Sequence, residues 1–468
     1  MNDFADRLSP MVVKELRQGM RSRSFLAPFL IVQLMMIVCV LISLDAEARK
    51  AVTTFFWFFT GVMLLVALPF RGIGSVRGEM REKTLELLLL TRLSAWRVVA
   101  GKWAALFLQT LLLASALLPY VVLRYFLGGV DLAGELVTLF WFLVANAILT
   151  AVCVGLSPFM YGFRGIIAAF MAPGLVPVVV VSMMDISRVS AVVPGSLRLM
   201  ATCLLGPLFI LSMFELAVAR IVPAAEDRSL FQRLLAVAIV AMAALLEGIY
   251  HTRGIFGGVA LVLVAPILIG AITSEAPPVP VLYGRYRPFG PRSRWRLPGP
   301  LSWAAGRFLR PGSATGIWFT LLIFTALALT SGIDLGNPRA WRLILSGIGA
   351  FLMPLLLARL LFPGKDRFVT WLCFEIFFFV LAILFSITKT LREHWISSLA
   401  PPVDFWLHLF NEALPTTDDP GFYLVCGITA GSLLLLVIGS RKEWKKIGEL
   451  EREARNLESG GEGVAFGS

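Results

Sequence analysis

The residue types that most often carry chemistry are few and widely spaced in this 468-residue chain. Its three histidines, His251, His394 and His408, form no HxxxH or HExxH arrangement of the kind that binds a metal. Its five cysteines lie within apolar stretches and have no paired spacing, which argues against a zinc site or a disulfide framework. They are Cys39, Cys153, Cys203, Cys373 and Cys426. The sequence therefore predicts no metal centre and no catalytic site.

One segment, Pro363-Gly364-Lys365-Asp366, contains the Gly-Lys pair of a phosphate-binding loop. It lacks the first glycine and the closing Ser or Thr of the GxxxxGK[ST] pattern, which supply part of the phosphate cradle and a Mg²⁺ ligand. We therefore expect that the chain does not hydrolyse ATP by itself. We expect it to bind no cofactor of its own.

Three ionisable residues, Glu215, Arg359 and Glu375, lie inside long apolar stretches, where a charge is costly and is a functional candidate by default. Each lies within about two turns of the predicted cytoplasmic end of its helix. Two interpretations are open. These residues could handle a substrate or a proton, or they could pair structurally, with Arg359 either snorkelling to the interface or binding Glu375. The second interpretation is favoured.

The elements that position these residues are predicted to be membrane-spanning helices. The chain is 58% apolar and 15% charged, with a mean hydropathy of +0.81, and its apolar residues fall in blocks near the roughly 20 residues that cross a bilayer. The predicted spans are 24–44, 51–70, 103–123, 136–157, 165–184, 201–222, 234–250, 254–273, 316–333, 342–362, 368–388 and 421–440. The fold class is thus an all-α polytopic membrane protein of about twelve helices. Within 234–273, a re-entrant or broken segment is the alternative to two full spans.

The net charge of +12 follows the loops in an alternating pattern. Lys and Arg are dense in 1–23, 71–102, 274–315 and 441–468, and sparser in the loops between them. By the positive-inside rule, the dense segments and both termini are cytoplasmic, and 389–420 is an external loop. This topology accounts for the charge without nucleic acid as a partner. Within the external loop, the aromatic segment 404–410 could form a gate or an interfacial anchor.

A short helix is predicted before the first span, because Ser9-Pro10 has the form of a helix N-cap followed by proline. Apolar residues then alternate with basic ones at helical spacing, as in a helix that lies in the membrane interface. The residues that define it are Lys14, Glu15, Leu16 and Arg17. A simple basic flank of the first span is the alternative.

The cytoplasmic loop 71–102 is the most informative segment. Leu85, Leu88 and Leu89 would share one face of a short helix, with acidic residues beside them, and Ser94 would cap the following helix. The residues assigned to this predicted docking surface are Glu79, Glu82, Thr84, Leu85, Glu86, Leu88 and Leu89. An apolar ridge of this kind needs a complementary groove on a partner.

At these residues the sequence resembles the membrane-spanning permeases of the ABC-2 family of ATP-binding cassette transporters. The resemblance lies in the acidic stretch, in Thr84-Leu85-Glu86, in Leu93-Ser94 and in Gly101-Lys102, together with the helix before the first span. It covers roughly residues 9–222. Two positions depart from the family pattern, because Lys83 replaces its glycine and Arg92 replaces its proline.

The resemblance implies that 71–102 is a coupling loop for a separate nucleotide-binding ATPase, which would bind ATP and Mg²⁺. It implies an exporter in the plasma membrane, the inner membrane of a bacterium, that works as a homodimer or with a second permease. A membrane scaffold or assembly subunit that transports nothing and is driven by an ATPase is the alternative. The substrate is not readable from the sequence.

The predicted organisation has four parts: the helix 1–23, a six-span core 24–222, a further six-span block 223–440 and a cytoplasmic tail 441–468. In the tail, Trp444, Ile447, Leu450 and Ala454 recur at helical spacing among charged residues. This pattern predicts an amphipathic helix that packs either on a partner or on its own chain.

Overall fold

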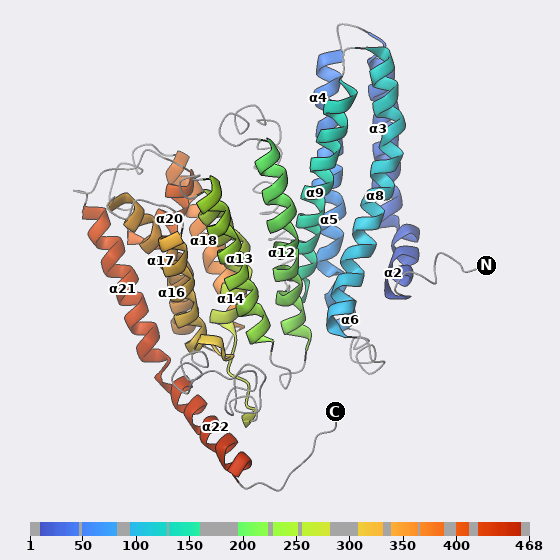
Figure 1. The fold of residues 1–468 in the computed structure, drawn as a ribbon. Helices are drawn as coiled ribbons and strands as arrows, with labels where there is room; N and C mark the ends of the chain where they lie inside the picture. Colours follow the sequence, from blue (N-terminus) through green and yellow to red (C-terminus); the bar gives the residue numbers. More distant parts are fainter. Residues whose placement is uncertain are drawn as a thin grey trace. The chain divides into compact units, whose positions relative to one another are not determined.

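The fold was examined in a computed structural model, which describes residues 10–45, 49–81, 94–128, 131–159, 195–222, 228–250, 255–280, 308–330, 338–363, 366–387, 399–410 and 420–459. The regular secondary structure of these residues is helical, and they contain no strand (Figure 1). The chain divides into two compact units, Met1–Val222 (unit 1) and Pro223–Ser468 (unit 2). Each unit has its own set of packed helices.

Eleven helices among the described residues are long and apolar enough to cross a membrane. They are Arg23–Ile42, Val52–Met80, Ala95–Leu127, Leu132–Phe159, Cys203–Ile221, Ser229–Tyr250, Phe256–Thr273, Ser313–Thr330, Trp341–Leu361, Arg367–Leu384 and Gly421–Gly439. Each corresponds to one predicted span, and the remaining prediction, 165–184, lies outside the described residues. The predicted class of helical, polytopic membrane protein is confirmed.

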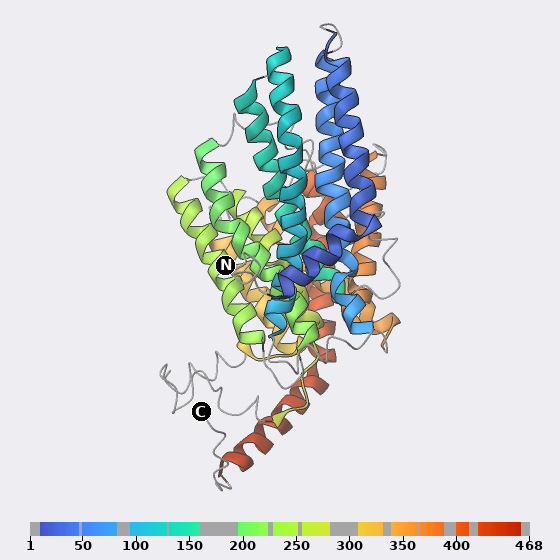
Figure 2. The same cartoon turned by 90° about the vertical axis from the view of Figure 1, so that its right-hand side faces the viewer.

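Unit 1 is built from helices that run alongside one another over most of their length (Figure 1). Its elements are α2 (Pro10–Arg21), α3 (Arg23–Ile42), α4 (Arg49–Gly61), η1 (Val62–Ala67), α5 (Leu68–Phe70), η2 (Arg71–Gly74), α6 (Ser75–Arg81), α8 (Ala95–Leu127), α9 (Leu132–Leu156), η3 (Ser157–Phe159) and α12 (Gly195–Ile221). Its core includes Met36, Phe56, Leu117 and Phe142 from four of these helices. Helix α2, in dark blue, instead lies across the lower part of the upright helices and packs on α8 (Figure 2).

The second span of unit 1 is continuous but irregular. Between α4 and α6 it passes through the π-helical segment η1, the short α5 and the 3-10 segment η2. Proline at position 69 has no N–H to donate and crowds the preceding turn, so a regular α-helix cannot pass through it unchanged. Asn146 of α9 compensates by donating from Nδ2 to the Leu64 carbonyl at 2.5 Å. The span that leads into the predicted coupling loop therefore contains a joint.

Unit 2 consists of α13 (Ser229–Tyr250), α14 (Ile255–Thr273), α16 (Ser313–Thr330), α17 (Pro338–Leu361), α18 (Arg367–Ile387), α20 (Pro401–Phe410), α21 (Pro420–Gly439) and α22 (Arg441–Ser459). Helices α13 and α14 are separate and pack on each other, so residues 234–273 form two full-length helices and not a single broken one. Helix α22 follows α21 almost without interruption (Figure 1).

Helix α20 lies beside the membrane-spanning part of α17. Gly349 is near the middle of α17, and a Cβ placed there would come within 2.4 Å of Pro401 Cβ, at the start of α20. A Cβ at Gly347 would lie 3.3 Å from the Phe405 ring. Two glycines therefore let α20 approach the α17 backbone closely. The aromatic segment 404–410, expected as a gate or an interfacial anchor, includes residues packed inside unit 2, since Asp404 and Leu407 are buried.

Candidate functional site

A buried lysine is the centre of a group of ion pairs at one end of unit 1. The side chain of Lys102 is 4% exposed, and its ammonium lies 2.9 Å from Glu15 Oε1 and 3.0 Å from Glu79 Oε1. Lys102 comes from α8, Glu15 from α2 and Glu79 from α6, so three elements meet at one nitrogen atom. Removing an ammonium from water is costly unless carboxylates neutralise it, and here two do so. We refer to these three residues as the Lys102 cluster.

The residue before this lysine explains how α2 comes close enough to reach it. A Cβ at Gly101 would lie 3.1 Å from Met11 Cγ, which is tighter than nearly all real contacts. Met11 and Val12 are buried against α8, whereas Lys14 and Arg17 on the other side of α2 are exposed and Leu16 is half-buried. The Gly-Lys pair thus has two physical roles, because the glycine admits the apolar face of α2 and the lysine binds its acidic residue.

The other end of α2 is held by Arg71, which lies in η2 of the second span. Its guanidinium Nη2 donates to the Gly19 carbonyl at 3.3 Å and to Ser22 Oγ at 3.2 Å, while Nη1 donates to Gln109 Oε1 of α8. The guanidinium also lies 5.4 Å from the centre of the Phe25 ring. Both ends of α2 are therefore fixed to α8 and to the second span.

Glu215, one of the predicted intramembrane candidates, connects α12 to the start of α8. Trp96 Nε1 donates to Glu215 Oε1 at 2.7 Å, and the Trp96 ring packs edge-on against Phe214 at 5.5 Å. Glu215 is 1% exposed. The start of α8 itself is defined by Ser94, whose hydroxyl accepts a hydrogen bond from the Arg97 N–H at 3.4 Å, which confirms the predicted cap.

The predicted docking surface is described only at its first residue. Glu79 belongs to the Lys102 cluster, and the other residues of that surface lie outside the described residues. They are Glu82, Thr84, Leu85, Glu86, Leu88 and Leu89. Their short helix stays a prediction, but both flanks of the segment 82–93 are fixed: α6 through Glu79 and α8 through Lys102. The two flanks of this segment and α2 are therefore joined through the ammonium group of Lys102.

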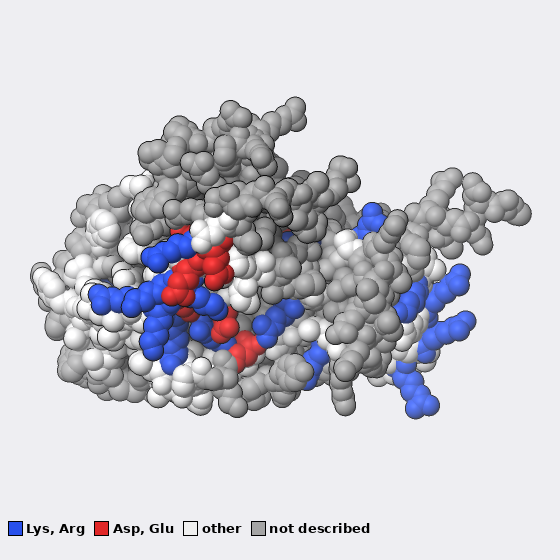
Figure 3. Space-filling model, turned by 90° about the horizontal axis from the view of Figure 1, so that it is seen from below, with Lys and Arg blue, Asp and Glu red and all other residues white. Residues whose placement is uncertain are grey.

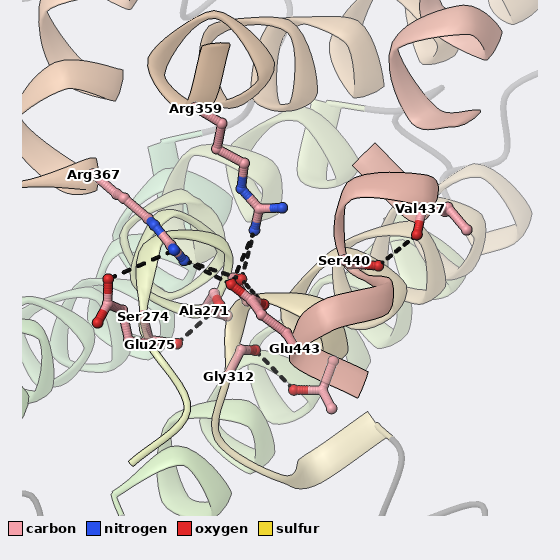
Figure 4. Close-up of polar contacts among 11 residues, drawn as sticks. Ala271, Ser274, Glu275, Gly312, Arg359, Arg367, Val437, Ser440 and Glu443 are labelled. Carbon is pink, nitrogen blue, oxygen red and sulfur yellow. Dashed lines mark hydrogen bonds and ion pairs between the residues drawn. The ribbon is translucent and has the colours of Figure 1, made fainter. Parts of the chain in front are cut away.

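Arg359, the second intramembrane candidate, does not pair with Glu375 as one interpretation of the sequence allowed. It lies 3.7 Å from Glu443 Oε1 of α22 and donates to Ser313 Oγ of α16 at 2.6 Å (Figure 4). Arg367, at the start of α18, lies 2.9 Å from the same Glu443 oxygen. Burial raises the pKa of the Glu443 carboxyl, but the hydrogen bond from Ser313 and the two guanidinium charges outweigh it and lower this pKa below its ordinary value.

Glu375, the third candidate, binds α20. Trp406 Nε1 donates to Glu375 Oε1 at 2.8 Å, so the carboxyl joins the middle of α18 to the short helix beside α17. Glu215 belongs to unit 1, and Arg359 and Glu375 have separate partners within unit 2. Among the described residues of unit 2, Arg359 and Glu375 therefore take part in different polar contacts and do not form one site.

Two buried ion pairs were missed by the sequence analysis. Arg124 and Glu135 are 2% and 6% exposed and lie 2.8 Å apart, on the two helices that flank a short loop of unit 1. Arg342 and Asp404 lie 2.7 Å apart in unit 2. Opposite charges on either side of a short helix connection could have indicated the first pair. No local signal indicates the second, since its members are 62 residues apart.

No protein-family model, curated protein or solved structure matches the chain significantly.

Proposed function

We propose that the chain is the membrane-spanning permease subunit of an ABC transporter of the ABC-2 type, and that it exports a substrate with ATP hydrolysed by a separate subunit. In this proposal the protein lies in the plasma membrane, the inner membrane of a bacterium, with both termini cytoplasmic and α2 in the membrane interface. ATP and Mg²⁺ bind the partner. The chain itself is not an enzyme.

The Lys102 cluster is the observation that carries this proposal. Coupling requires that a push by an ATPase on the segment 82–93 reaches the membrane spans. Lys102 joins the two flanks of this segment through Glu79 and joins both to α2 through Glu15. The flanks continue directly into two spans, of which one contains the π-helical joint at Val62–Ala67. Such a joint is a common place for a helix to change its direction.

The proposed orientation is supported by the positions of basic residues within each unit. In unit 1, exposed Lys14, Arg17, Arg21 and Arg97 all lie on α2 or at the start of α8. In unit 2, the exposed basic residues of α22 follow the last span. Cytoplasmic segments near the ends of spans carry such an excess of Lys and Arg.

The proposal also requires a second permease. One coupling segment serves one ATPase subunit, and transporters of this type use a pair of them. A homodimer would supply two copies of the Lys102 cluster and two segments 82–93. A second, different permease would supply the same number.

The test is capture of the ATPase. We would purify the tagged full-length chain from its native membranes, irradiate it with 8-azido-ATP and identify labelled proteins by mass spectrometry. The expected result is a labelled P-loop ATPase in the eluate. The combined changes Leu85→Asp, Leu88→Asp and Leu89→Asp should lower its recovery by roughly tenfold or more, because carboxylates in the centre of an apolar interface remove its main binding energy.

Substitution of the same three leucines by Met is the matched control, because it keeps the ridge apolar and of similar volume. This variant should retain the ATPase. Both variants must elute from size-exclusion chromatography like the unmodified chain. A folded Asp variant that recovers as much ATPase as the unmodified chain would refute the coupling role. An unmodified chain that captures no labelled ATPase would refute the transporter assignment.

A further inference from the structure

Helix α22 begins directly after α21, the last candidate membrane span, and is connected to it by continuous hydrogen bonding. The backbone hydrogen bonds continue from α21 into α22 through Ser440, whose N–H donates to the Leu436 carbonyl at 2.9 Å and whose carbonyl accepts from the Trp444 N–H at 2.9 Å. The Ser440 hydroxyl also donates to the Val437 carbonyl (Figure 4). The first turns of α22 therefore have a fixed position beside the end of α21.

One side of α22 is turned toward its own unit. Ile447 and Leu450 are buried, and they form a cluster with Ala276 and with the partly buried Trp444. The acidic Glu443 on this side binds Arg359 and Arg367. Farther along the helix, Glu451 binds Arg310. The tail helix predicted from the sequence thus packs on its own chain, and its inward carboxylates are neutralised by arginines of other elements.

The opposite side of α22 carries four exposed basic residues near the membrane. They are Arg441, Lys442, Lys445 and Lys446. None of the four forms an ion pair or a side-chain hydrogen bond with another described residue. At 100° per residue they cover about 140° of the helix circumference, which is a single face. Seen from below, Lys and Arg side chains lie around Asp and Glu side chains on one part of the described surface (Figure 3).

The exposed charges change sign with distance from the membrane. Beyond the four basic residues, the described exposed charges on the same face are Glu449, Arg452 and Glu453, which are two acidic residues and one basic residue. The seven helical steps from Gly439 to Lys446 rise by about 10 Å. This distance is comparable to the headgroup layer and to the Debye length at physiological salt. On this exposed face, the basic residues are thus concentrated at the level of the lipid headgroups, and the exposed acidic residues lie farther along the helix.

We propose that Arg441, Lys442, Lys445 and Lys446 form a binding site for anionic phospholipid headgroups in the leaflet that α21 leaves. Clusters of four or more Lys and Arg directly beyond a membrane span attract such lipids, and each basic residue adds a similar electrostatic contribution to the binding free energy. The basic residues lie in the first turns of α22, which is where the negatively charged headgroups of the leaflet would lie. A soluble acidic protein or a nucleic acid would provide no reason for four of the basic residues to gather within two turns of the span.

The experiment compares lipid retention by the full-length chain and its variants. Detergent-purified protein is mixed with micelles that contain equal amounts of phosphatidylglycerol and phosphatidylcholine, and bound lipids are counted by native mass spectrometry. The unmodified chain should retain phosphatidylglycerol preferentially. Replacement of all four basic residues by Gln should reduce this preference roughly tenfold or more. Raising the NaCl concentration to about 0.5 M should reduce it in the unmodified chain as well, because salt screens exposed charges.

Arg452→Gln is the matched control, since Arg452 is exposed on the same face but lies two turns farther from the membrane. It should leave the lipid preference unchanged. A variant with Arg in place of each of the three lysines keeps the charge and should also retain the lipid. The proposal is overturned if the fourfold Gln variant retains as much phosphatidylglycerol as the unmodified chain, or if Arg452→Gln lowers retention equally. It is also overturned if the unmodified chain shows no preference between the two lipids. Binding of RNA or of an acidic protein to this face, without a lipid preference, would be one such outcome.

Discussion

Lys102 Nζ lies 2.9 Å from Glu15 Oε1, and this contact joins the helix before the first span to the helix of the third. The lysine is almost fully buried, whereas the side chain of Glu15 is 21% exposed. The pair therefore lies at the edge of the unit, where the cost of burying the charge is shared with a second carboxylate, that of Glu79. Its geometry makes α2 a structural part of the predicted coupling region.

Replacement of Lys102 by Met should release α2. Without the ammonium, Glu15 and Glu79 are left as two neighbouring carboxylates in a partly buried place, and breaking such a group costs on the order of 3 kcal/mol. We expect a lower melting temperature of the full-length chain in detergent and faster hydrogen exchange over Pro10–Arg21. Lys14→Met is the control, since Lys14 is exposed on the other side of α2. Unchanged exchange in the Lys102 variant would show that the cluster does not hold α2.

Substitution of two helical glycines, Gly101 and Gly78, separates the effect of close packing from the effect of helix propensity. Gly101→Leu should destabilise unit 1 by about 1–3 kcal/mol, because the new side chain must displace Met11 and Val12. Gly78→Leu in α6 should be neutral or slightly stabilising, since no described residue lies within 4 Å of a Cβ there and leucine is the better helix former. Thermal unfolding of the two variants in the same detergent gives the comparison. Equal destabilisation by both changes would argue against a specific role for Gly101.

The contact of α22 with its unit should depend on pH through Glu443. Its pKa in the folded chain is lowered, so the contact contributes full stability above the ordinary value of 4.5 and loses it as pH falls through the lowered value. Proteolysis within Arg441–Ser459 should therefore accelerate when the pH is lowered from about 6 to about 3. Cleavage is measured with a neutral protease at about pH 6 and with pepsin at about pH 3, and each rate is divided by the rate at which the same protease cleaves an unfolded peptide of these residues at that pH.

Glu443→Gln should make this proteolysis fast at both pH values, because an amide cannot neutralise Arg359 and Arg367. Glu449→Gln is the matched control, since Glu449 is exposed on the outer side of the same helix. It should preserve the pH dependence of the unmodified chain. If Glu443→Gln and the unmodified chain showed the same pH profile, the ion pairs of Glu443 would not be what holds α22 in place.

The helices could be predicted from the sequence because each membrane span is a continuous block of apolar residues of sufficient length. The same holds for the cap at Ser94 and for the two sides of α22. The sequence did not predict which spans touch. In a bilayer the lipid-facing and helix-facing residues are both apolar, so a span's apolar pattern does not reveal its neighbours. Leu112 and Leu113 are adjacent in α8, yet the first is exposed and the second is buried.

Polar partners were missed for a related reason. Glu15, Glu79 and Lys102 were each singled out in the sequence or lay in a segment that was, but nothing local showed that they meet at one nitrogen. Glu375 was one of the two possibilities considered for Arg359, because the two residues lie on neighbouring predicted spans, whereas Glu443 lies in the tail. Contacts of this kind depend on how α22 folds back against α16, α17 and α18. That packing involves residues from four separate elements.

The pair of Arg342 and Asp404 allows a test of how α20 is held beside α17. Asp404→Leu leaves a guanidinium buried without its carboxylate, and the expected cost is about 3–5 kcal/mol. The double variant Arg342→Met, Asp404→Leu removes both charges and should recover most of this loss, since buried apolar residues can replace a buried ion pair. The measurement is thermal unfolding of the single and double variants in a double-mutant cycle. Additive losses would mean that the two residues act independently, and α20 would then be held by its apolar contacts and by Trp406 alone.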